Sequence, residues 1–217
     1  MTKLIVIAKA PVAGRVKTRL CPPCSPEQAA AIAEAALRDT LDVVTSVPGA
    51  EPVIALDGAA GNWLPDGVDV VQQRGDGLAS RLDAAFADVG TPAVLIGMDT
   101  PQITVGLLAY AIDAITDDGN DCVLGSAVDG GWWAIGFRHP QRGAFDGVPM
   151  STAHTGRAQR ERLRAMGVRV AELPILRDVD TMASAIAVAE QVPHRRFAEA
   201  VREVVTEHDR AGAAVDG

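Results

Sequence analysis

Short apolar runs alternate along the chain with longer segments in which apolar residues recur at helical spacing. The runs are rich in branched side chains and suit buried strands. They are Lys3–Ala8, Pro52–Leu56, Val68–Gln72, Ala93–Gly97, Asp121–Ser126, Trp132–Phe137 and Val168–Leu173. Most are separated by an amphipathic helical pattern, which is typical of a mainly parallel sheet covered by helices. The pattern therefore predicts a three-layer α/β/α fold.

One link in this series is too short to contain a helix. Between the two runs in Cys122–Phe137 stands only Val128–Gly131, with the sequence Val-Asp-Gly-Gly. A link of this length suits an antiparallel hairpin, so we expect a mixed, mainly parallel sheet. The first helix has a clear start, because Ser25 suits the N-cap, Pro26 the first helical position and Gln28 a capping box.

Length, composition and charge limit the alternatives. With 217 residues, 48% of them hydrophobic, we expect a single domain over residues 1–210 and a disordered tail over residues 211–217. The first apolar run is too short for a secretory signal, and no run approaches the roughly 18 residues of a membrane span, so we expect a cytoplasmic protein. A formal net charge of −8 disfavours nucleic acid as a partner. The oligomeric state stays open.

The segment after the first strand concentrates positive charge in an otherwise acidic chain. A loop at the carboxyl end of a strand in an α/β sheet lies where ligands bind, and a glycine there permits close approach of a phosphate. Two-residue spacing places Arg15, Lys17 and Arg19 on one side of an extended loop. The alternative is a solvated basic turn. The predicted nucleotide-binding residues are Ala8, Lys9, Gly14, Arg15, Lys17 and Arg19, with Lys17 also a catalytic candidate.

A glycine-rich segment leads into the second helical pattern. Within it, Gln73, Gly75 and Arg81 are predicted to form a wall around the nucleobase. The motif itself has low specificity.

Acidic residues after two of the strands predict a site for Mg²⁺ or Mn²⁺. Asp99 ends a buried run, and a carboxylate at that position suits a metal bound to substrate phosphates, which makes Asp99 a metal-binding and catalytic candidate. Its alternative role is to cap a turn or helix. Asp178 and Asp180 alternate before a predicted helix, so one of them faces the metal and the other caps the helix. Their residue types do not decide which.

An acid and two glycines precede a pair of tryptophans in the predicted hairpin. Aromatic faces beside a carboxylate suit a sugar or another polyhydroxylated acceptor, and Asp129 would bind its hydroxyls or act as a general base. The alternative is a plain turn with core aromatics, and one tryptophan is expected only to pack because neighbours on a strand face opposite ways. The predicted acceptor-binding residues are Gly130, Gly131, Trp132, Ser151 and His154, with Asp129 as a catalytic candidate.

Taken in order, seven motifs resemble a bacterial family of glycosyltransferase-A-like proteins, some of them associated with arsenosugar biosynthesis. They are KAPVAGRVKTRL, SPEQAA, RDTL, QRGDGLASRL, LIGMDTP, LGSAVDGGWWAIGF and DVDT, and they run from about Lys3 to Val188. The resemblance implies the fold of nucleotide-diphospho-sugar transferases. That superfamily also includes the molybdenum-cofactor guanylyltransferases and the phospholactate or phosphoenolpyruvate guanylyltransferases, and the first motif and DVDT are especially similar to the latter group.

Carried over to this chain, the resemblance implies roles for individual residues. The implied phosphate contacts are Gly14, Arg15, Lys17 and Arg19, and the implied metal ligands are Asp99 and Asp180. Asp129 and its glycines match the family's DGG motif. Trp132 stands where the family commonly has tyrosine, and Met150 stands where it has tryptophan. Both differences concern the acceptor.

These observations leave three hypotheses. A nucleotide-sugar glycosyltransferase would release a nucleoside diphosphate when a small-molecule acceptor attacks the anomeric carbon. A nucleotidyltransferase would release pyrophosphate when an acceptor phosphate or carboxylate attacks the α-phosphorus of a nucleoside triphosphate. A nucleotide-binding module would do neither. The cation-rich loop and a single Asp99 without Asp-x-Asp favour the second hypothesis, whereas the extent of the family resemblance and DGG beside tryptophan favour the first, which we prefer.

Overall fold

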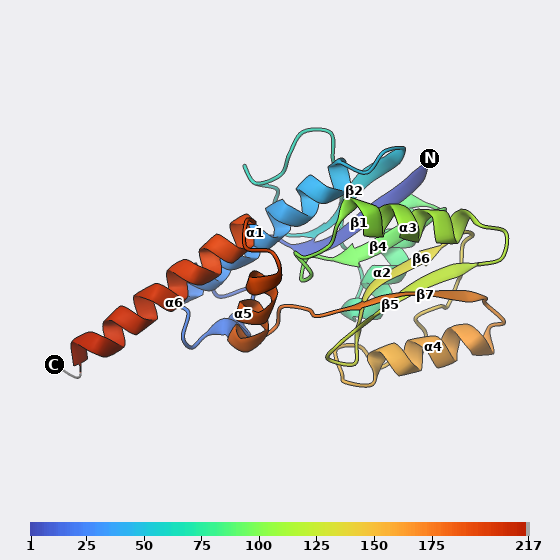
Figure 1. The fold of residues 1–217 in the computed structure, drawn as a ribbon. Helices are drawn as coiled ribbons and strands as arrows, with labels where there is room; N and C mark the ends of the chain where they lie inside the picture. The colour runs from blue at the N-terminus through green and yellow to red at the C-terminus, as the bar shows by residue number, and fades with distance from the viewer. Residues whose placement is uncertain (216–217) are drawn as a thin grey trace.

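One sheet with seven strands forms the centre of the protein. The computed structural model describes residues 1–215, and side chains through residue 210. Within this part of the chain the strand order is β3-β2-β1-β4-β6-β5-β7 (Figure 1). The strands are β1 (Thr2–Lys9), β2 (Ala50–Asp57), β3 (Asp69–Gln72), β4 (Ala93–Gly97), β5 (Cys122–Ala127), β6 (Trp132–Phe137) and β7 (Val170–Leu176). All seven predicted strands are present, with ends shifted by up to three residues.

The sheet is mixed, as the short Val128–Gly131 link predicts. β1 is parallel to both β2 and β4, β2 is parallel to β3, and β5 is parallel to β7. β6 is antiparallel to its two neighbours, β4 and β5. The predicted hairpin and the mainly parallel sheet are therefore confirmed.

The helices follow the predicted amphipathic patterns. They are α1 (Pro26–Thr45), α2 (Gly77–Val89), α3 (Val105–Thr116), α4 (Thr155–Ala165), α5 (Met182–Gln191) and α6 (Arg196–Val215), with a short 3₁₀ helix, η1 (Thr18–Leu20). The capping box of α1 is formed, because the Ser25 hydroxyl accepts from the Gln28 backbone N–H and the Gln28 side chain accepts from the Ser25 N–H. None of the helices within residues 1–215 combines the length and the apolar character that a membrane crossing requires.

The predicted disordered tail begins inside α6. The structure continues this helix through Val215, and the alanine-rich sequence of residues 211–214 favours a helix. Residues 216–217 lie outside the described part of the chain.

Helices cover both faces of the sheet, which gives the predicted three layers. Successive residues of β1 point to opposite faces, so Leu4 and Val6 pack in the core beneath α1 and α3, whereas Ile5 packs in the core beneath α2 and α4. These three β1 residues are fully buried. Burial on both sides explains why the strands are continuous apolar runs rather than alternating ones.

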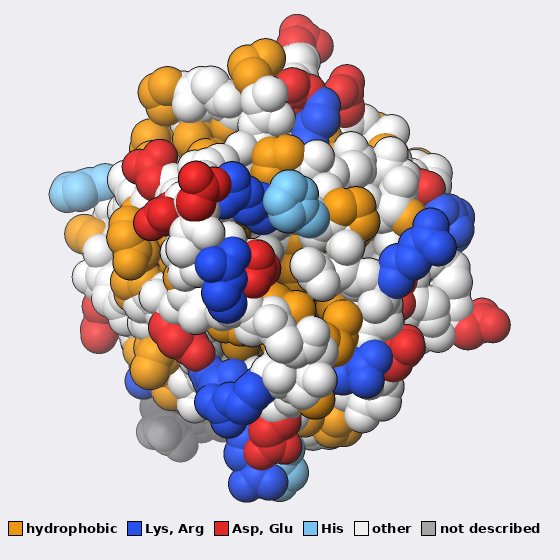
Figure 2. Space-filling model, turned by 90° about the vertical axis from the view of Figure 1, so that its right-hand side faces the viewer, with side chains coloured by type: hydrophobic (Ala, Val, Ile, Leu, Met, Phe, Trp, Pro, Cys, Tyr) orange, Lys and Arg blue, Asp and Glu red, His pale blue; other side chains and the backbone are white. Residues whose placement is uncertain are grey.

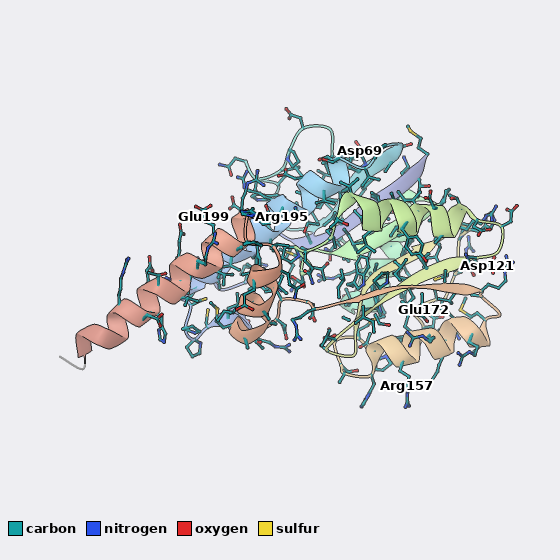
Figure 3. The ribbon with its side chains drawn as sticks, in the orientation of Figure 1. Asp69, Asp121, Arg157, Glu172, Arg195 and Glu199 are labelled. Atoms are coloured by element: carbon teal, nitrogen blue, oxygen red, sulfur yellow. The ribbon has the colours of Figure 1, made fainter. Side chains whose placement is uncertain are left out.

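Helices α5 and α6 pack against each other, and α6 packs against α1. The buried Asp39 carboxylate of α1 accepts a hydrogen bond of 2.9 Å from the Phe197 backbone N–H at the start of α6. Arg195, labelled in Figure 3 where α6 meets α1, donates to the carbonyl oxygens of Asp39 and Ile103. These contacts hold the C-terminal helices in place, and therefore also the segment that joins β7 to α5.

The parallel strands begin at one edge of the sheet and end at the other, and the loops that could bind a ligand gather at the second edge. The side of the molecule where β1 begins faces the viewer in Figure 2, and basic and acidic side chains are interspersed over it. At the other edge the parallel strands end and β6 begins, so the loops after β1, β2, β4, β5 and β7 gather there. In an α/β sheet this is the edge where ligands bind.

Candidate functional site

A cavity of about 670 Å³ opens at the carboxyl edge of the sheet. Most residues that the sequence predicts for the site line this cavity, although they come from distant parts of the chain. They are Ala8, Lys9, Arg15, Lys17, Arg19, Gln73, Arg81, Asp99, Asp129, Gly131, Trp132, Ser151 and Asp180. The fold thus brings the predicted phosphate, metal and acceptor residues around one space. We call Arg15, Lys17 and Arg19 the cationic wall, and Asp129, Gly131 and Trp132 the acidic wall.

The cationic wall is formed by turns, not by an extended loop. The Arg15 backbone N–H donates to the Val12 carbonyl at 3.0 Å, which closes a turn around Gly14. Lys17 has left-handed backbone angles, with φ 50° and ψ 34°, and the 3₁₀ helix η1 follows directly. The extended loop predicted from the two-residue spacing is therefore wrong. The three cations still line one cavity because the turns redirect the chain.

Gly14 acts through its backbone conformation. Its φ of 73° lies in the left-handed region, where a side chain is unfavourable, and Gly14 is not among the residues that line the cavity. The structure therefore associates Gly14 with the shape of the turn that carries Arg15.

Lys17 connects three parts of the site. Its side chain is only 8% exposed, and its Nζ lies 2.5 Å from Asp99 Oδ1. The same ammonium donates to the Val179 carbonyl, and the Val179 N–H donates to the Asp99 carbonyl at 2.8 Å. The cation is thus fixed where the loop after β1, the end of β4 and the segment after β7 meet. A phosphate that enters the cavity would meet an ammonium that is already positioned.

Asp180 pairs with Arg19 in the same cavity. The Arg19 Nη1 lies 2.5 Å from Asp180 Oδ2, and this hydrogen bond and the charge of Asp180 raise the pKa of Arg19. The cap of α5 is Thr181, whose hydroxyl accepts from the Ser184 N–H. Neither Asp178 nor Asp180 is therefore the N-cap, contrary to the expectation that one of the two caps this helix.

Asp178 does not line the larger cavity. It lines a smaller cavity of about 110 Å³ together with Asp99 and Asp129. Burial, reinforced by the negative charges of Asp129 and Asp99, raises the pKa of Asp178. The structure thus distributes the two acids of DVDT between two cavities, with Asp99 lining both.

The acidic residues of the larger cavity fit a metal that takes most of its ligands from a substrate and water. The Asp99 and Asp180 side chains are 46% and 45% exposed, so an ion bridging to a phosphate could reach each of them. Mg²⁺ in particular binds few carboxylates and keeps several waters. Over the described residues, no group of three or more His, Cys, Asp or Glu side chains is arranged to hold a metal ion by itself. A metal here would therefore depend on the nucleotide for its remaining ligands.

Gln73 and Arg81 form one end of the cavity, beside the ends of β1 and β2. The Gln73 Nε2 donates at 2.8 Å to the carbonyl oxygens of Ala8 and Ala55, and Arg81 donates to Asp57 Oδ2 at 2.8 Å. These bonds fix the polar groups that a nucleobase would meet. Gly75 does not line the cavity.

The two neighbouring tryptophans have different roles. Trp133 is 3% exposed and its Nε1 donates to the Pro174 carbonyl at 2.9 Å, so it belongs to the core. Trp132 lines the cavity and stacks against Phe145, with ring centroids 6.4 Å apart. Trp133 thus packs in the core, as expected of one of the pair, and it also borders the smaller cavity.

The DGG turn is held against the loop before α4. Gly130 has a φ of 90°, and a Cβ there would lie 2.1 Å from the Ala153 carbonyl oxygen. The Gly156 N–H also donates to the Gly130 carbonyl at 2.8 Å. Gly130 therefore shapes the acidic wall from outside the cavity. The Gly131 N–H donates to Asp129 Oδ1 at 2.8 Å, which orients the carboxylate.

The loop before α4 supplies residues other than those predicted. Ser151 lines the cavity, whereas His154 is exposed and does not. Thr152 and Thr155 line it as well, and the sequence points only to their segment. Asp57, which pairs with the cavity residue Arg81, is a further residue that sequence reasoning misses, although its place at the end of a buried strand is the signal that identifies Asp99. Thr100, whose hydroxyl has no hydrogen-bond partner within the described residues, has no such signal.

Comparison with known proteins agrees with this architecture. Residues 32–152, more than half of the chain, match the family described as an uncharacterized protein conserved in bacteria (DUF2064). The chain belongs to this family. No curated protein matches the chain.

Solved structures share the fold over most of the chain. A protein from Desulfovibrio desulfuricans G20, provisionally described as a nucleotide-diphospho-sugar transferase, is 24% identical with a TM-score of 0.86, covering 97% of this chain and 98% of that protein. CMP:2-keto-3-deoxy-manno-octonic acid synthetase complexed with CTP is 15% identical with a TM-score of 0.52, covering 88% of this chain and all of that protein. Glucosyl-3-phosphoglycerate synthase from Mycobacterium tuberculosis, in complex with Mn²⁺, UDP and glucosyl-3-phosphoglycerate, is 10% identical with a TM-score of 0.53, covering 82% of this chain and 70% of that protein. The nucleotide-diphospho-sugar transferase fold expected from the sequence is thus confirmed.

Proposed function

We propose that this protein is a glycosyltransferase that uses a nucleotide sugar and a divalent metal ion. The observation that carries the proposal is the division of one cavity into a cationic wall and an acidic wall that contains Trp132. Cations suit the diphosphate of the donor, and an aromatic face beside a carboxylate suits a sugar. The two walls therefore match the two halves of the reaction.

The donor would lie with its base near Gln73 and Arg81 and its diphosphate along the cationic wall. Lys17 is held by Asp99 and the Val179 carbonyl, so little reorganisation is needed to direct its ammonium at a phosphate. Arg15 is exposed and has no side-chain bond within the described residues, which leaves its guanidinium available to the same group. Binding would place the sugar between the cationic wall and Asp129.

The chemical step joins an acceptor hydroxyl to the anomeric carbon. The hydroxyl oxygen forms the new bond to that carbon, while the bond from the carbon to the diphosphate oxygen breaks with its electron pair remaining on the diphosphate. The hydroxyl proton passes to the Asp129 carboxylate, which has no ion-pair partner within the described residues. Lys17 stabilises the negative charge that develops on the leaving nucleoside diphosphate.

Asp99 and Asp180 would hold Mg²⁺ or Mn²⁺ against the diphosphate. Such an ion neutralises charge on the leaving group. Because Asp99 and Asp180 each pair with a cation of the basic loop, metal and nucleotide are expected to bind together, not independently.

Nucleotidyl transfer is the second candidate, and the cationic wall favours it. Three cations around one cavity suit a triphosphate as well as a diphosphate. The fold does not choose between the two reactions, because the proteins that share it include one complexed with CTP and one complexed with UDP. In this case the acceptor would attack the α-phosphorus and pyrophosphate would leave.

A binding panel tests the proposal. Isothermal titration of the protein with nucleoside triphosphates, nucleoside diphosphates and nucleotide sugars, each with Mg²⁺, with Mn²⁺ and with chelator, is expected to select one nucleotide sugar in a metal-dependent way. Tight binding of a triphosphate without a response to any nucleotide sugar would favour the second candidate and contradict the first. Nucleotide binding that persists without turnover in any product assay would support a non-catalytic module.

A further inference from the structure

A second, smaller cavity adjoins the site. Its volume is about 110 Å³, and it shares Asp99, Asp129 and Trp132 with the larger cavity. Thr100 and Asp178 line only the smaller one. Because a water needs roughly 10–15 Å³ of such space, this cavity has room for several waters or for a hydroxylated arm of a larger molecule.

Two residues that line this cavity carry buried polar atoms without hydrogen-bond partners in the described part of the chain. Thr100 is 1% exposed, and its Oγ1 has no hydrogen-bond partner within the described residues. The Trp132 Nε1 is likewise buried and unpaired in this part of the chain. Buried polar atoms are almost always satisfied, since leaving one unpaired destabilises the fold. A hydroxyl group could accept from the indole N–H and also bond the threonine hydroxyl.

The charge around the small cavity is negative. Its ionisable lining residues, as far as the structure describes them, are Asp99, Asp129 and Asp178. Only Asp99 has an ion-pair partner among the described residues, the Lys17 ammonium at 2.5 Å. Asp129 and Asp178 have no ion-pair partner among these residues, although the Lys17 charge also acts on Asp178. Three carboxylates therefore face one ammonium, so a phosphate or carboxylate in this space would meet a net negative charge, whereas a neutral hydroxyl would not.

The same carboxylates do not form a cation site of their own. No trio of acidic, histidine or cysteine side chains in the described residues is arranged to hold a metal ion. Carboxylate oxygens also accept hydrogen bonds from hydroxyl donors.

We propose that the small cavity is the acceptor subsite and that it selects neutral polyhydroxylated acceptors over phosphorylated or carboxylated ones. Thr100 and the Trp132 N–H bind acceptor hydroxyls, and the charge of Asp178 excludes anions. This inference rests on the proposed glycosyl transfer. It also separates the two candidate reactions, because a nucleotidyl acceptor must present a phosphate or a carboxylate.

Tryptophan fluorescence provides a test that does not require turnover. Two of the three tryptophans, Trp132 and Trp133, line the cavity. Protein saturated with the nucleoside diphosphate chosen by the binding panel is titrated with glucose, mannose, galactose, ribose and glycerol, and with the phosphate of each. Glucose is also compared with glucuronate. At least one neutral compound is expected to change the fluorescence and to bind about fivefold or more tightly than its phosphate, because repulsion between near charges has that order of magnitude.

Two variants test which residues cause the preference for a neutral ligand over its phosphate. Thr100→Val keeps the shape and removes the hydroxyl, and it is expected to weaken the neutral ligand about fivefold. Asp178→Asn is expected to narrow the preference for the neutral ligand over its phosphate by a similar factor. Asp69→Asn, at the exposed start of β3, is the matched control and is expected to leave the preference unchanged.

Several outcomes overturn this inference. Tighter binding of a phosphate than of its neutral parent contradicts it, and so does the absence of any neutral ligand from the titrations. An unchanged preference in both cavity variants also contradicts it. Mn²⁺ binding without nucleotide that is lost in Asp178→Asn would identify a cation site instead. If a neutral ligand binds as expected but no nucleotide sugar is turned over, the proposed function fails and the cavity's preference stands.

Discussion

The two walls of the cavity differ in how their charges are balanced. In the cationic wall, Lys17 pairs with Asp99 and Arg19 pairs with Asp180, each at 2.5 Å. In the acidic wall, Asp129 has no cationic partner within the described residues, and its carboxylate is oriented only by the Gly131 N–H. Two of the three cations in the cationic wall are therefore paired with carboxylates, whereas the carboxylate of the acidic wall has no cationic partner within the described residues.

This difference suggests that the cationic wall binds the nucleotide and that the acidic wall selects the acceptor. Cations held by ion pairs, as Lys17 and Arg19 are, suit a substrate that always carries phosphates, because the ion pairs hold the charges in place before binding. An uncompensated acidic wall suits a substrate that must not be charged. Changes in the cationic wall are therefore expected to weaken nucleotide binding, and changes in the acidic wall to reduce transfer or alter the acceptor.

Asp129→Asn is expected to give the largest effect. The amide keeps the size of the side chain and can still accept from the Gly131 N–H, but it cannot take a proton, so transfer should fall about 10³-fold. Nucleotide affinity should stay within about twofold, since Asp129 lies on the wall opposite the phosphates. Titration calorimetry and a product assay measure the two quantities. Equal losses of affinity and transfer would contradict the separation of the walls.

Lys17→Met removes the positioned ammonium and keeps an apolar stem of similar length. Nucleotide affinity is expected to fall about 100-fold because charge-assisted bonds to phosphate are lost. Thermal unfolding of the variant shows whether the fold persists without the bonds to Asp99 and Val179. A folded variant that binds nucleotide as the parent does would contradict the phosphate role of Lys17.

Arg15→Ala tests the same wall without an ion pair to break. The side chain is exposed, so we expect an unchanged Tm and a loss of nucleotide affinity of about tenfold. Arg157→Ala is the control, because Arg157 lies on α4 with a side chain that is 79% exposed (Figure 3). Similar affinity losses in the two variants would point to a general effect of charge.

Asp121→Asn tests a charge pair away from the cavity and is expected to have the smallest effect. Hydrogen bonds from the Arg169 guanidinium and backbone N–H lower the pKa of Asp121 from 3.8 to about 2. The carboxylate therefore stabilises the fold above pH 3.8, and this contribution is lost as the pH falls toward 2.

At neutral pH the variant should lower the Tm by only a few degrees, with nucleotide binding unchanged. The difference in Tm between parent and variant should shrink as the pH falls through that window. A constant difference at every pH would show that the ion pair is not its cause.

The fold could be predicted because its signals are local. Apolar runs placed the strands, the capping box at Ser25 and Gln28 placed the start of α1, and the short Val128–Gly131 link predicted the antiparallel hairpin. These features depend on residues close together in sequence, so a single chain reveals them.

The site could be predicted only in part, because its geometry depends on residues far apart. The rule that ligands bind at strand carboxyl ends pointed to Lys17 and Asp99, and the Asp-Gly-Gly turn beside the tryptophans pointed to Asp129; all three line the cavity. The left-handed conformation of Lys17 and the capping of α5 by Thr181 instead of an aspartate have no clear sequence signal. The pairing of Arg19 with Asp180 joins residues 161 positions apart, which no local pattern indicates.

The most direct test of the central claim is the identity of the phosphorus product. The protein is incubated with Mg²⁺ or Mn²⁺, the nucleotide sugar selected by calorimetry and a neutral polyol, and the reaction is followed by ³¹P NMR. Glycosyl transfer predicts a nucleoside diphosphate that accumulates in step with a glycosylated polyol and is lost in Asp129→Asn. Pyrophosphate released from a nucleoside triphosphate with an anionic acceptor, and no nucleoside diphosphate from any nucleotide sugar, would contradict it.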